Sequence, residues 1–284
     1  MRDTRDMLLV LLSSLLMLTG CSRRDILDDY PVSGVEISLD WNGVTNKLPE
    51  GVRVIFYPKN AEGRKIDTYL SVKGGKVKVP PGRYSVVVYN YDTETVQIRG
   101  EEAYETIEAF TGHCNGLGIA GTEQLVWGPD PLYVVRIDDL KIENSEEELQ
   151  LNWKPKLVVK TYSFKLKVQG LEYVSSIVGS IEGMSSCYDL GLGCGKAGDS
   201  PIYFAARGSA GEVTGSFTVF GTSEGVISRA GNAIKLTLAF VKTDNKVQKM
   251  EVDITEVIAN SESGGSGGDD DGDEPFKEIE LPVE

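Results

Sequence analysis

Histidine is almost absent from this chain and cysteine is scarce, since its 284 residues include one histidine, His113, and four cysteines. Metal sites built on imidazole need several histidines, so this composition excludes most of them. The cysteines also lack the paired CxxC spacing of a zinc module. We therefore expect neither a resident metal ion nor another cofactor.

Basic residues are also fewer than acidic residues. The chain has 29 basic residues against 43 acidic residues, which gives a formal net charge of −14. Nucleic-acid binding requires a basic patch that contacts phosphates, so we expect no nucleic-acid partner. Charge alone would likewise not hold so acidic a protein on an anionic bilayer.

Sequence motifs of catalysis are missing as well. A Ser–His–Asp or Cys–His site would have to use His113, whose neighbour Cys114 points the opposite way on an extended chain. The sequence contains no P-loop, HExxH motif, nucleophile elbow or dinucleotide-binding glycine pattern. We assign no catalytic residue and expect a protein that is not an enzyme.

The N-terminal hydrophobic run, Met7–Leu18, is too short to span a membrane and has the length of the apolar part of a signal peptide. A lipobox, the cleavage site of a bacterial lipoprotein precursor, begins at the last residue of this run and comprises Leu18, Thr19, Gly20 and Cys21. We predict a signal peptide over residues 1–20 and a mature N-terminal Cys21 that carries acyl chains, because two or more chains anchor a protein stably. The alternative is an ordinary secretory leader that happens to contain a cysteine.

Alternation of apolar and polar residues dominates the rest of the chain. Clear examples are Val35–Trp41, Arg83–Tyr91 and Ile234–Val241. The middle of Arg83–Tyr91 is apolar on both faces, which predicts a central strand. Glycine and proline turns separate the segments, and convincing amphipathic helices are almost absent. We predict an all-β protein built from antiparallel β-sandwiches.

The mature chain divides into a tether over residues 21–31, an N-terminal domain over 32–157 and a C-terminal domain over 158–284. Within the second domain, the Gly/Ser-rich and acidic run 261–273 predicts a flexible, solvated linker. Residues 276–284 predict a terminal strand whose apolar face carries Ile279, Leu281 and Val283. This strand completes its own sheet or pairs with a partner chain, and both alternatives stay open.

Cys187 and Cys194 lie seven positions apart in a glycine-rich stretch. A flexible loop of that length can bring two Cα atoms within disulfide range, and an oxidising compartment preserves such a bond. We therefore predict a Cys187–Cys194 bridge. The alternative is two unpaired thiols, and Cys114 is left without a partner in either case.

Three segments carry a family resemblance: LPEGVRVIFYP from Leu48, GGKVKVPPGRYSVVVYNYDTETVQIRG from Gly74, and FKLKVQGLEYVSSIVGSIEGM from Phe164. Together with the lipobox, they resemble the FimB/Mfa family of fimbrial anchor lipoproteins from Bacteroidales. The resemblance implies two transthyretin-like β-sandwich domains and a lipid-anchored position at the bacterial outer membrane, displayed at the cell surface or, as the alternative, facing the periplasm. It also implies a role in the attachment and assembly of type V fimbriae through β-strand contacts with fimbrial subunits.

A second hypothesis is a glycan-binding surface lipoprotein. Trp41, Trp127, Trp153 and the run Tyr89–Asp92 could form an aromatic stacking platform with polar rims. The competing interpretation is that these rings fill the core, since Trp41 lies on the apolar face of its strand.

Overall fold

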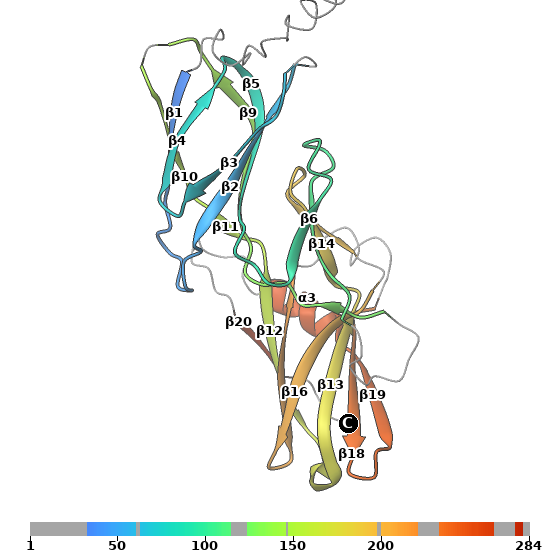
Figure 1. The fold of residues 1–284 in the computed structure, drawn as a ribbon. Coiled ribbons are helices and arrows are strands. Elements are labelled where there is room, and N and C mark those ends of the chain that lie inside the picture. The colour runs from blue at the N-terminus through green and yellow to red at the C-terminus, as the bar shows by residue number, and fades with distance from the viewer. Residues whose placement is uncertain are drawn as a thin grey trace, which may run out of the picture.

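The computed structural model is built almost entirely of strands, which confirms the all-β prediction (Figure 1). It describes residues 33–60, 63–114, 124–145, 147–197, 200–220, 233–263 and 276–280. The predicted signal peptide, Leu18, Thr19, Gly20, Cys21 and the tether lie outside these residues. Among the helices that the structure describes, none combines the length and the apolar character that crossing a membrane would take.

The N-terminal lobe is one eight-stranded sheet, the N-terminal sheet, in the order β10-β1-β4-β3-β2-β5-β9-β11. The strands are β1 (Ser33–Leu39), β2 (Gly51–Pro58), β3 (Ile66–Ser71), β4 (Gly74–Val79), β5 (Gly82–Asn90), β9 (Tyr133–Ile142), β10 (Leu149–Trp153) and β11 (Lys156–Leu157). Neighbours pair antiparallel, apart from the parallel pair of β1 and β10. The sheet curls around a core that includes Val35, Ile37, Val54, Phe56, Val86, Val88 and Trp153.

Strand β5 is buried along most of its length because both of its faces are covered. Val86 and Val88 face the core of the N-terminal lobe, whereas Val87 and Tyr89 belong to a second hydrophobic core. The strand lies between β2 and β9. The prediction of a central strand, made from its two apolar faces, is therefore confirmed.

The C-terminal lobe holds the C-terminal sheet, in the order β19-β18-β13-β16-β17-β12-β20. Its strands are β12 (Lys160–Lys167), β13 (Val174–Glu182), β16 (Ile202–Ser209), β17 (Glu212–Val219), β18 (Lys235–Lys242), β19 (Val247–Asp253) and β20 (Phe276–Glu280). The core includes Tyr162, Phe164, Phe217, Leu236 and Leu238. The 3-10 helix η1 (Leu171–Tyr173) follows β12, and the helix α3 (Thr255–Ser263) reaches three residues into the segment predicted as a linker. The remainder of that segment lies outside the described residues.

A third sheet, the bridging sheet, is built from both halves of the chain in the order β15-β14-β7-β6. Strands β6 (Val96–Arg99) and β7 (Glu108–Thr111) precede the domain boundary predicted at Leu157, whereas β14 (Ser185–Asp189) and β15 (Cys194–Ala197) follow it. Strand β14 pairs antiparallel with β7. A second crossing is made by β8 (Val126–Trp127), which pairs parallel with β16. Segments from each side of the predicted boundary thus share two sheets.

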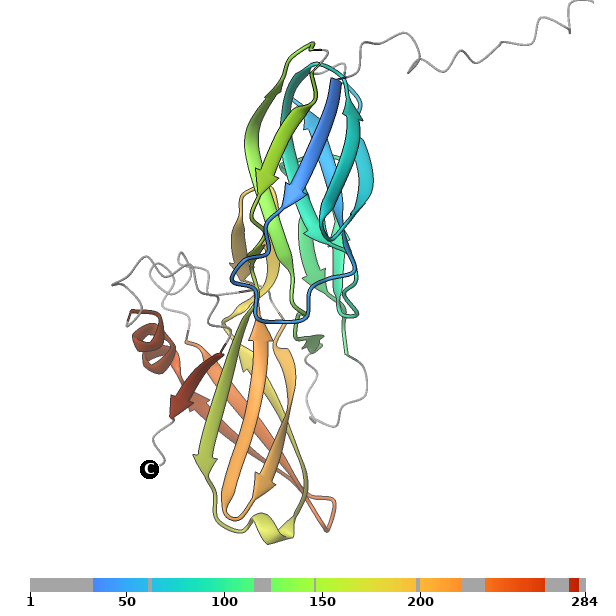
Figure 2. The same ribbon diagram turned by 90° about the vertical axis from the view of Figure 1, so that its left-hand side faces the viewer.

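The bridging sheet covers the outer face of the N-terminal sheet and forms the second core with it. That core contains Ile55, Tyr57, Val87, Tyr89, Val96, Ile107, Ala109, Leu132, Val134, Val159, Leu190 and Phe220. Figure 2 shows the two lobes end to end, with the start of β1 at one end of the molecule and η1 at the other. The second core lies where the lobes meet, so its side chains contribute to holding them together.

We predict that Leu190→Ala lowers the free energy of unfolding by about 2–5 kcal/mol, because Leu190 is 0% exposed in the second core and its truncation leaves a cavity. Chemical denaturation measures this change. Leu192→Ala, two residues further along the same turn, is the matched control. Leu192 is 61% exposed, so we expect its change to stay within about 0.5 kcal/mol. Equal effects of the two substitutions would contradict the packing described.

Candidate functional site

A network of charged side chains joins the strands of the bridging sheet. Glu108 of β7 accepts a hydrogen bond from Lys196 Nζ of β15 at 2.9 Å and another from Arg99 Nε of β6, also at 2.9 Å. Lys196 also pairs with the Asp189 carboxylate of β14 at 2.8 Å. Asp189 is nearly fully buried. One lysine therefore contacts carboxylates from both halves of the chain, and it links the halves at their shared sheet.

The charged side chains of Glu108 and Lys196 in this network shift each other's pKa values. Burial acts to raise the pKa of Glu108, but the hydrogen bonds from Lys196 and Arg99 outweigh it and hold that pKa below its ordinary value. The hydrogen bonds to Asp189 and Glu108 raise the pKa of Lys196 well above its usual range. Glu108 and Lys196 are thus both charged at neutral pH, and each stabilises the ionised form of the other.

Cys187 and Cys194 lie on the adjacent strands β14 and β15. Cys187 is opposite Lys196 and Cys194 is opposite Asp189, so the two cysteines occupy diagonal positions on one face of the hairpin. Diagonal Cα atoms lie about 7–8 Å apart, beyond the usual disulfide range of about 4.4–6.8 Å. Both are free thiols in this structure. The bridge stays a prediction and requires a local shift of the hairpin.

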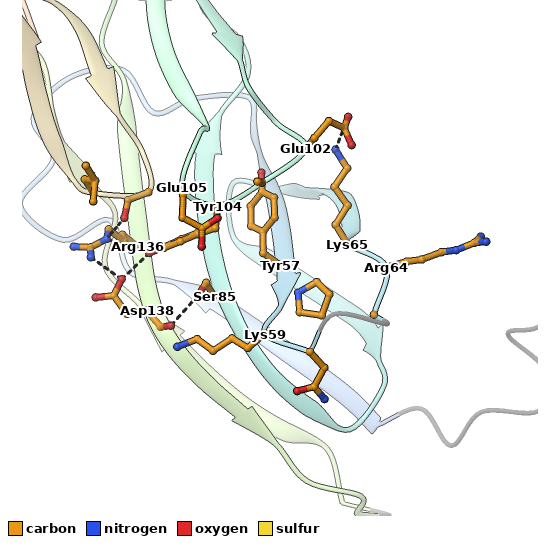
Figure 3. Close-up of a pocket in the computed structure, with 16 residues that line it drawn as sticks. Tyr57, Lys59, Arg64, Lys65, Ser85, Glu102, Tyr104, Glu105, Arg136 and Asp138 are labelled. Atoms are coloured by element: carbon orange, nitrogen blue, oxygen red, sulfur yellow. Dashed lines mark hydrogen bonds and ion pairs between the residues drawn. The ribbon is translucent and has the colours of Figure 1, made fainter.

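A pocket of about 1030 Å³ opens between the N-terminal sheet and the turns of the bridging sheet (Figure 3). Tyr57 and Ser85 line it from the N-terminal sheet. Tyr104, from the β6–β7 connection, and Leu192, from the β14–β15 turn, also line it. The pocket is therefore formed where the two halves of the chain meet.

Polar side chains in this pocket hold one another in fixed positions. Arg136 donates from Nε to the Tyr104 hydroxyl at 3.1 Å and to the Gly191 carbonyl at 2.6 Å, and from Nη2 to Asp138 at 2.6 Å. The Tyr104 hydroxyl donates to Asp138 at 2.7 Å. Burial, followed by the hydrogen bond to Asp138, raises the pKa of Tyr104 to about 12, so its phenol stays protonated at neutral pH. The arrangement offers fixed hydrogen-bonding groups to a polar ligand.

No group of three or more His, Cys, Asp or Glu residues that could hold a metal ion occurs in the part of the chain that the structure describes. The lone His113 forms an isolated bridge with Val126, and its neighbour Cys114 is buried. Burial raises the pKa of the Cys114 thiol, which disfavours the thiolate form.

Part of the predicted terminal strand forms β20, which pairs parallel with β12 at the edge of the C-terminal sheet. Ile279 is opposite Phe164 in this pairing. Leu281 and Val283 lie outside the described residues. The backbone of Phe276–Glu280 therefore adds to its own lobe in this structure, while pairing with a partner chain stays a prediction.

The aromatic residues considered for a glycan platform are not gathered on one surface. Trp41 and Trp153 pack in the N-terminal core, and Trp41 Nε1 donates to the Val72 carbonyl at 2.6 Å. Tyr89 is buried in the second core. Trp127 lies against Tyr203 where the lobes meet, with ring centroids 5.4 Å apart. The core-filling interpretation thus describes most of these rings.

Tyr91, from the run considered for the glycan platform, is exposed and pairs with Tyr69, which the sequence analysis missed. The rings of Tyr69 and Tyr91 approach edge to face, with centroids 5.3 Å apart. Tyr69 lies in the short strand β3, whereas Tyr91 follows the last residue of β5. No local sequence pattern indicates that the two rings meet.

Comparisons with known proteins find relatives with names that refer to fimbriae and adhesion. The family model described as "Domain of unknown function (DUF5119)" matches residues 20–205. The chain is 61% identical over 294 residues to a Bacteroides ovatus protein named "Putative fimbrium anchoring subunit Fim4B", covering 99% of this chain and 88% of that protein.

Solved structures extend the comparison. The crystal structure of a "putative adhesin" from Bacteroides ovatus has a TM-score of 0.79 at 57% identity, covering 93% of this chain and 94% of that one. The fimbrial anchor protein Mfa2 from Porphyromonas gingivalis has a TM-score of 0.55 at 11% identity, covering 88% of this chain and 90% of that one. Mfa2 therefore shares the fold.

We predict that Glu108→Gln lowers the free energy of unfolding by about 1–3 kcal/mol at pH 7, because it removes a charge hydrogen-bonded to two cations. The folded pKa of Glu108 is depressed, so its contribution is present above its unfolded pKa of about 4.3 and is lost as pH falls through the folded value. The difference from wild type should therefore shrink on acidification.

Denaturation at several pH values measures this difference, with Glu143→Gln as the control. Glu143 pairs with Lys141 at an exposed site, where an ion pair contributes little to stability. A gap between wild type and Glu108→Gln that stays constant from pH 7 to pH 3 would refute the proposed electrostatic role.

Proposed function

We propose a fimbrial role for this chain, which belongs to the DUF5119 family and to the FimB/Mfa-type fimbrial anchor proteins of Bacteroidales. The mature protein is held in the outer membrane by acyl chains on Cys21 and faces the cell surface. There it takes part in pilus attachment and assembly by binding fimbrial subunits through β-strand contacts. The observation that carries this proposal is the near full-length match to a protein named as a fimbrium anchoring subunit.

The elongated shape fits a protein that connects a membrane to a filament. The segment that leads from Cys21 enters the fold at β1, at one end of the molecule (Figure 2). A lipid at Cys21 would put that end near the bilayer and the C-terminal lobe at the far end. The bridging sheet and the second core connect the two ends, so the protein can pass a pulling load from one to the other.

The far lobe has a strand suited to exchange with a fimbrial subunit. Strand β20 is the edge of the C-terminal sheet and pairs with one described strand, β12. A segment rich in Gly and Asp precedes it in the sequence. Release of β20 would expose backbone donors and acceptors on β12 for a partner strand, and the released segment could itself add to a partner's sheet.

Glycan binding is the alternative function, and the pocket of Figure 3 is the feature that favours it. The rings of Tyr57 and Tyr104 lie beside the charged groups of Arg136 and Asp138, and sugar hydroxyls both donate and accept hydrogen bonds. Saturable binding of a glycan by protein that lacks Cys21, with no binding of a fimbrial subunit, would favour this alternative.

We predict that wild-type protein incorporates a palmitate analogue in living cells and fractionates with the outer membrane, whereas Cys21→Ala does neither, because it removes the acylated thiol. Metabolic labelling followed by fractionation measures both properties. Cys114→Ala serves as the control and should be labelled like wild type. Unlabelled wild-type protein that washes out of the cells would show that the lipid anchor is wrong.

We predict that deletion of residues 276–284 leaves the protein folded but abolishes binding of a fimbrial subunit, because β20 is an edge strand that follows a long connection. Circular dichroism and a pull-down with the purified subunit test the two parts. Lys249→Glu on β19, at the opposite edge of the sheet, should leave binding intact. Loss of folding on deletion would instead assign the segment a purely structural role in its own lobe.

A further inference from the structure

A slot of about 190 Å³ lies beside strand β6. It shares no lining residue with the pocket of Figure 3. Tyr69 and Tyr91 line it from the N-terminal sheet, and Val96 and Ile98 of β6 line it from the bridging sheet. The slot therefore runs alongside an outer strand of the bridging sheet, which is labelled in Figure 1.

The two tyrosines give this surface an apolar and accessible wall. Tyr69 is 61% exposed and Tyr91 is 45% exposed, although both rings are large. Tyrosine supplies a rigid contact surface at low entropic cost and is enriched among the residues that dominate binding energy at interfaces. An exposed pair of this kind is a feature of a docking surface.

The Arg53 guanidinium, which lines the slot, already uses all of its hydrogen-bond donors within the protein. Arg53 donates to both Asp67 carboxylate oxygens, at 2.8 and 2.6 Å, to both Glu101 carboxylate oxygens, and to the Tyr89 hydroxyl at 2.8 Å. These five hydrogen bonds use all five N–H groups of the guanidinium. The guanidinium therefore has no free N–H to donate to a ligand in the slot. The other lining groups include the rings of Tyr69 and Tyr91 and the aliphatic side chains of Val96 and Ile98.

The edge of strand β6 supplies backbone hydrogen-bonding groups beside the slot. Among the strands that the structure describes, β6 pairs with β7 alone, so its other edge is open. Val96 and Ile98 pack toward the second core, whereas Gln97 and Arg99 are exposed. An open edge beside an apolar slot fits an extended peptide, whose backbone pairs with the edge while one side chain enters the slot.

The rim of the slot is acidic. Asp92 and Glu94 flank the lining residue Thr93, and the Asp92 carboxylate accepts a hydrogen bond from the backbone N–H of Glu50. All three acidic side chains are exposed. Arg99 lies nearby on β6, but it pairs with Glu108. Charge complementarity thus favours a partner segment in which Lys or Arg flanks the apolar residue.

We propose that this slot binds an extended segment of a fimbrial subunit, which adds to the bridging sheet as a further strand beside β6. An apolar side chain of the segment enters between Tyr69 and Ile98, and basic residues on either side lie over the acidic rim. The inference rests on the proposed fimbrial function and gives it a second contact surface, on the N-terminal lobe.

Binding of a purified fimbrial subunit from the same bacterium to the full mature chain tests this inference. The double variant Tyr69→Ala/Tyr91→Ala should weaken the Kd at least tenfold, while its Tm stays close to wild type because both rings are exposed. Tyr173→Ala is the matched control. Tyr173 is 63% exposed on the C-terminal lobe, and its Kd should stay within twofold of wild type. Hydrogen exchange should show new protection of β6 amides in the complex.

The outcomes separate this inference from the fimbrial role itself. If the subunit binds wild type and the double variant equally, without protection of β6, the slot is not the docking site and the fimbrial role stands. If the subunit does not bind the wild-type protein at all, both the slot inference and the proposed fimbrial function are overturned. If a soluble envelope glycan binds in a way that depends on Tyr69 and Tyr91, the surface belongs to carbohydrate recognition and the peptide inference is wrong.

Discussion

The pairing of β7 with β14 is the contact on which the rest of the architecture depends. It aligns Phe110, Ala109 and Glu108 from the first half of the chain with Cys187, Tyr188 and Asp189 from the second. The second core and the Lys196 network reinforce it. The pocket of Figure 3 takes its walls from both halves, and the slot beside β6 is bounded by a sheet that exists through this pairing.

A shared sheet has a mechanical consequence for the proposed role, in which the protein links a membrane to a filament. Two sandwiches joined by a linker alone would reorient freely under load. Here, separation of the lobes requires breaking backbone hydrogen bonds between β7 and β14 and between β8 and β16, and it exposes Leu190 and Phe220 to water. Because hydrophobic burial contributes about 25 cal/mol per Å² of apolar area, the second core alone opposes that separation substantially.

Much of the fold was predictable because local patterns encode it. The alternation in Val35–Trp41 predicted β1, and the two apolar faces of Arg83–Tyr91 predicted the central position of β5. The pairing of strands far apart in the sequence was not predictable in the same way, since nothing near Glu108 in the sequence indicates that it lies beside Asp189. Tyr69 likewise gave no local signal, because its role depends on the ring of Tyr91, which lies far from it in the sequence. The candidate surfaces follow from long-range pairing, which hydrophobic periodicity does not specify.

Single-molecule pulling between the start of β1 and the C-terminal lobe tests the central claim, that the two lobes bear load as one unit. Handles attached at residues 33 and 260 would apply force across the bridging sheet. The account predicts that the lobes stay together until one large cooperative unfolding event, with no earlier extension at low force. Lobe separation at low force, followed by independent unfolding of each lobe, would contradict it.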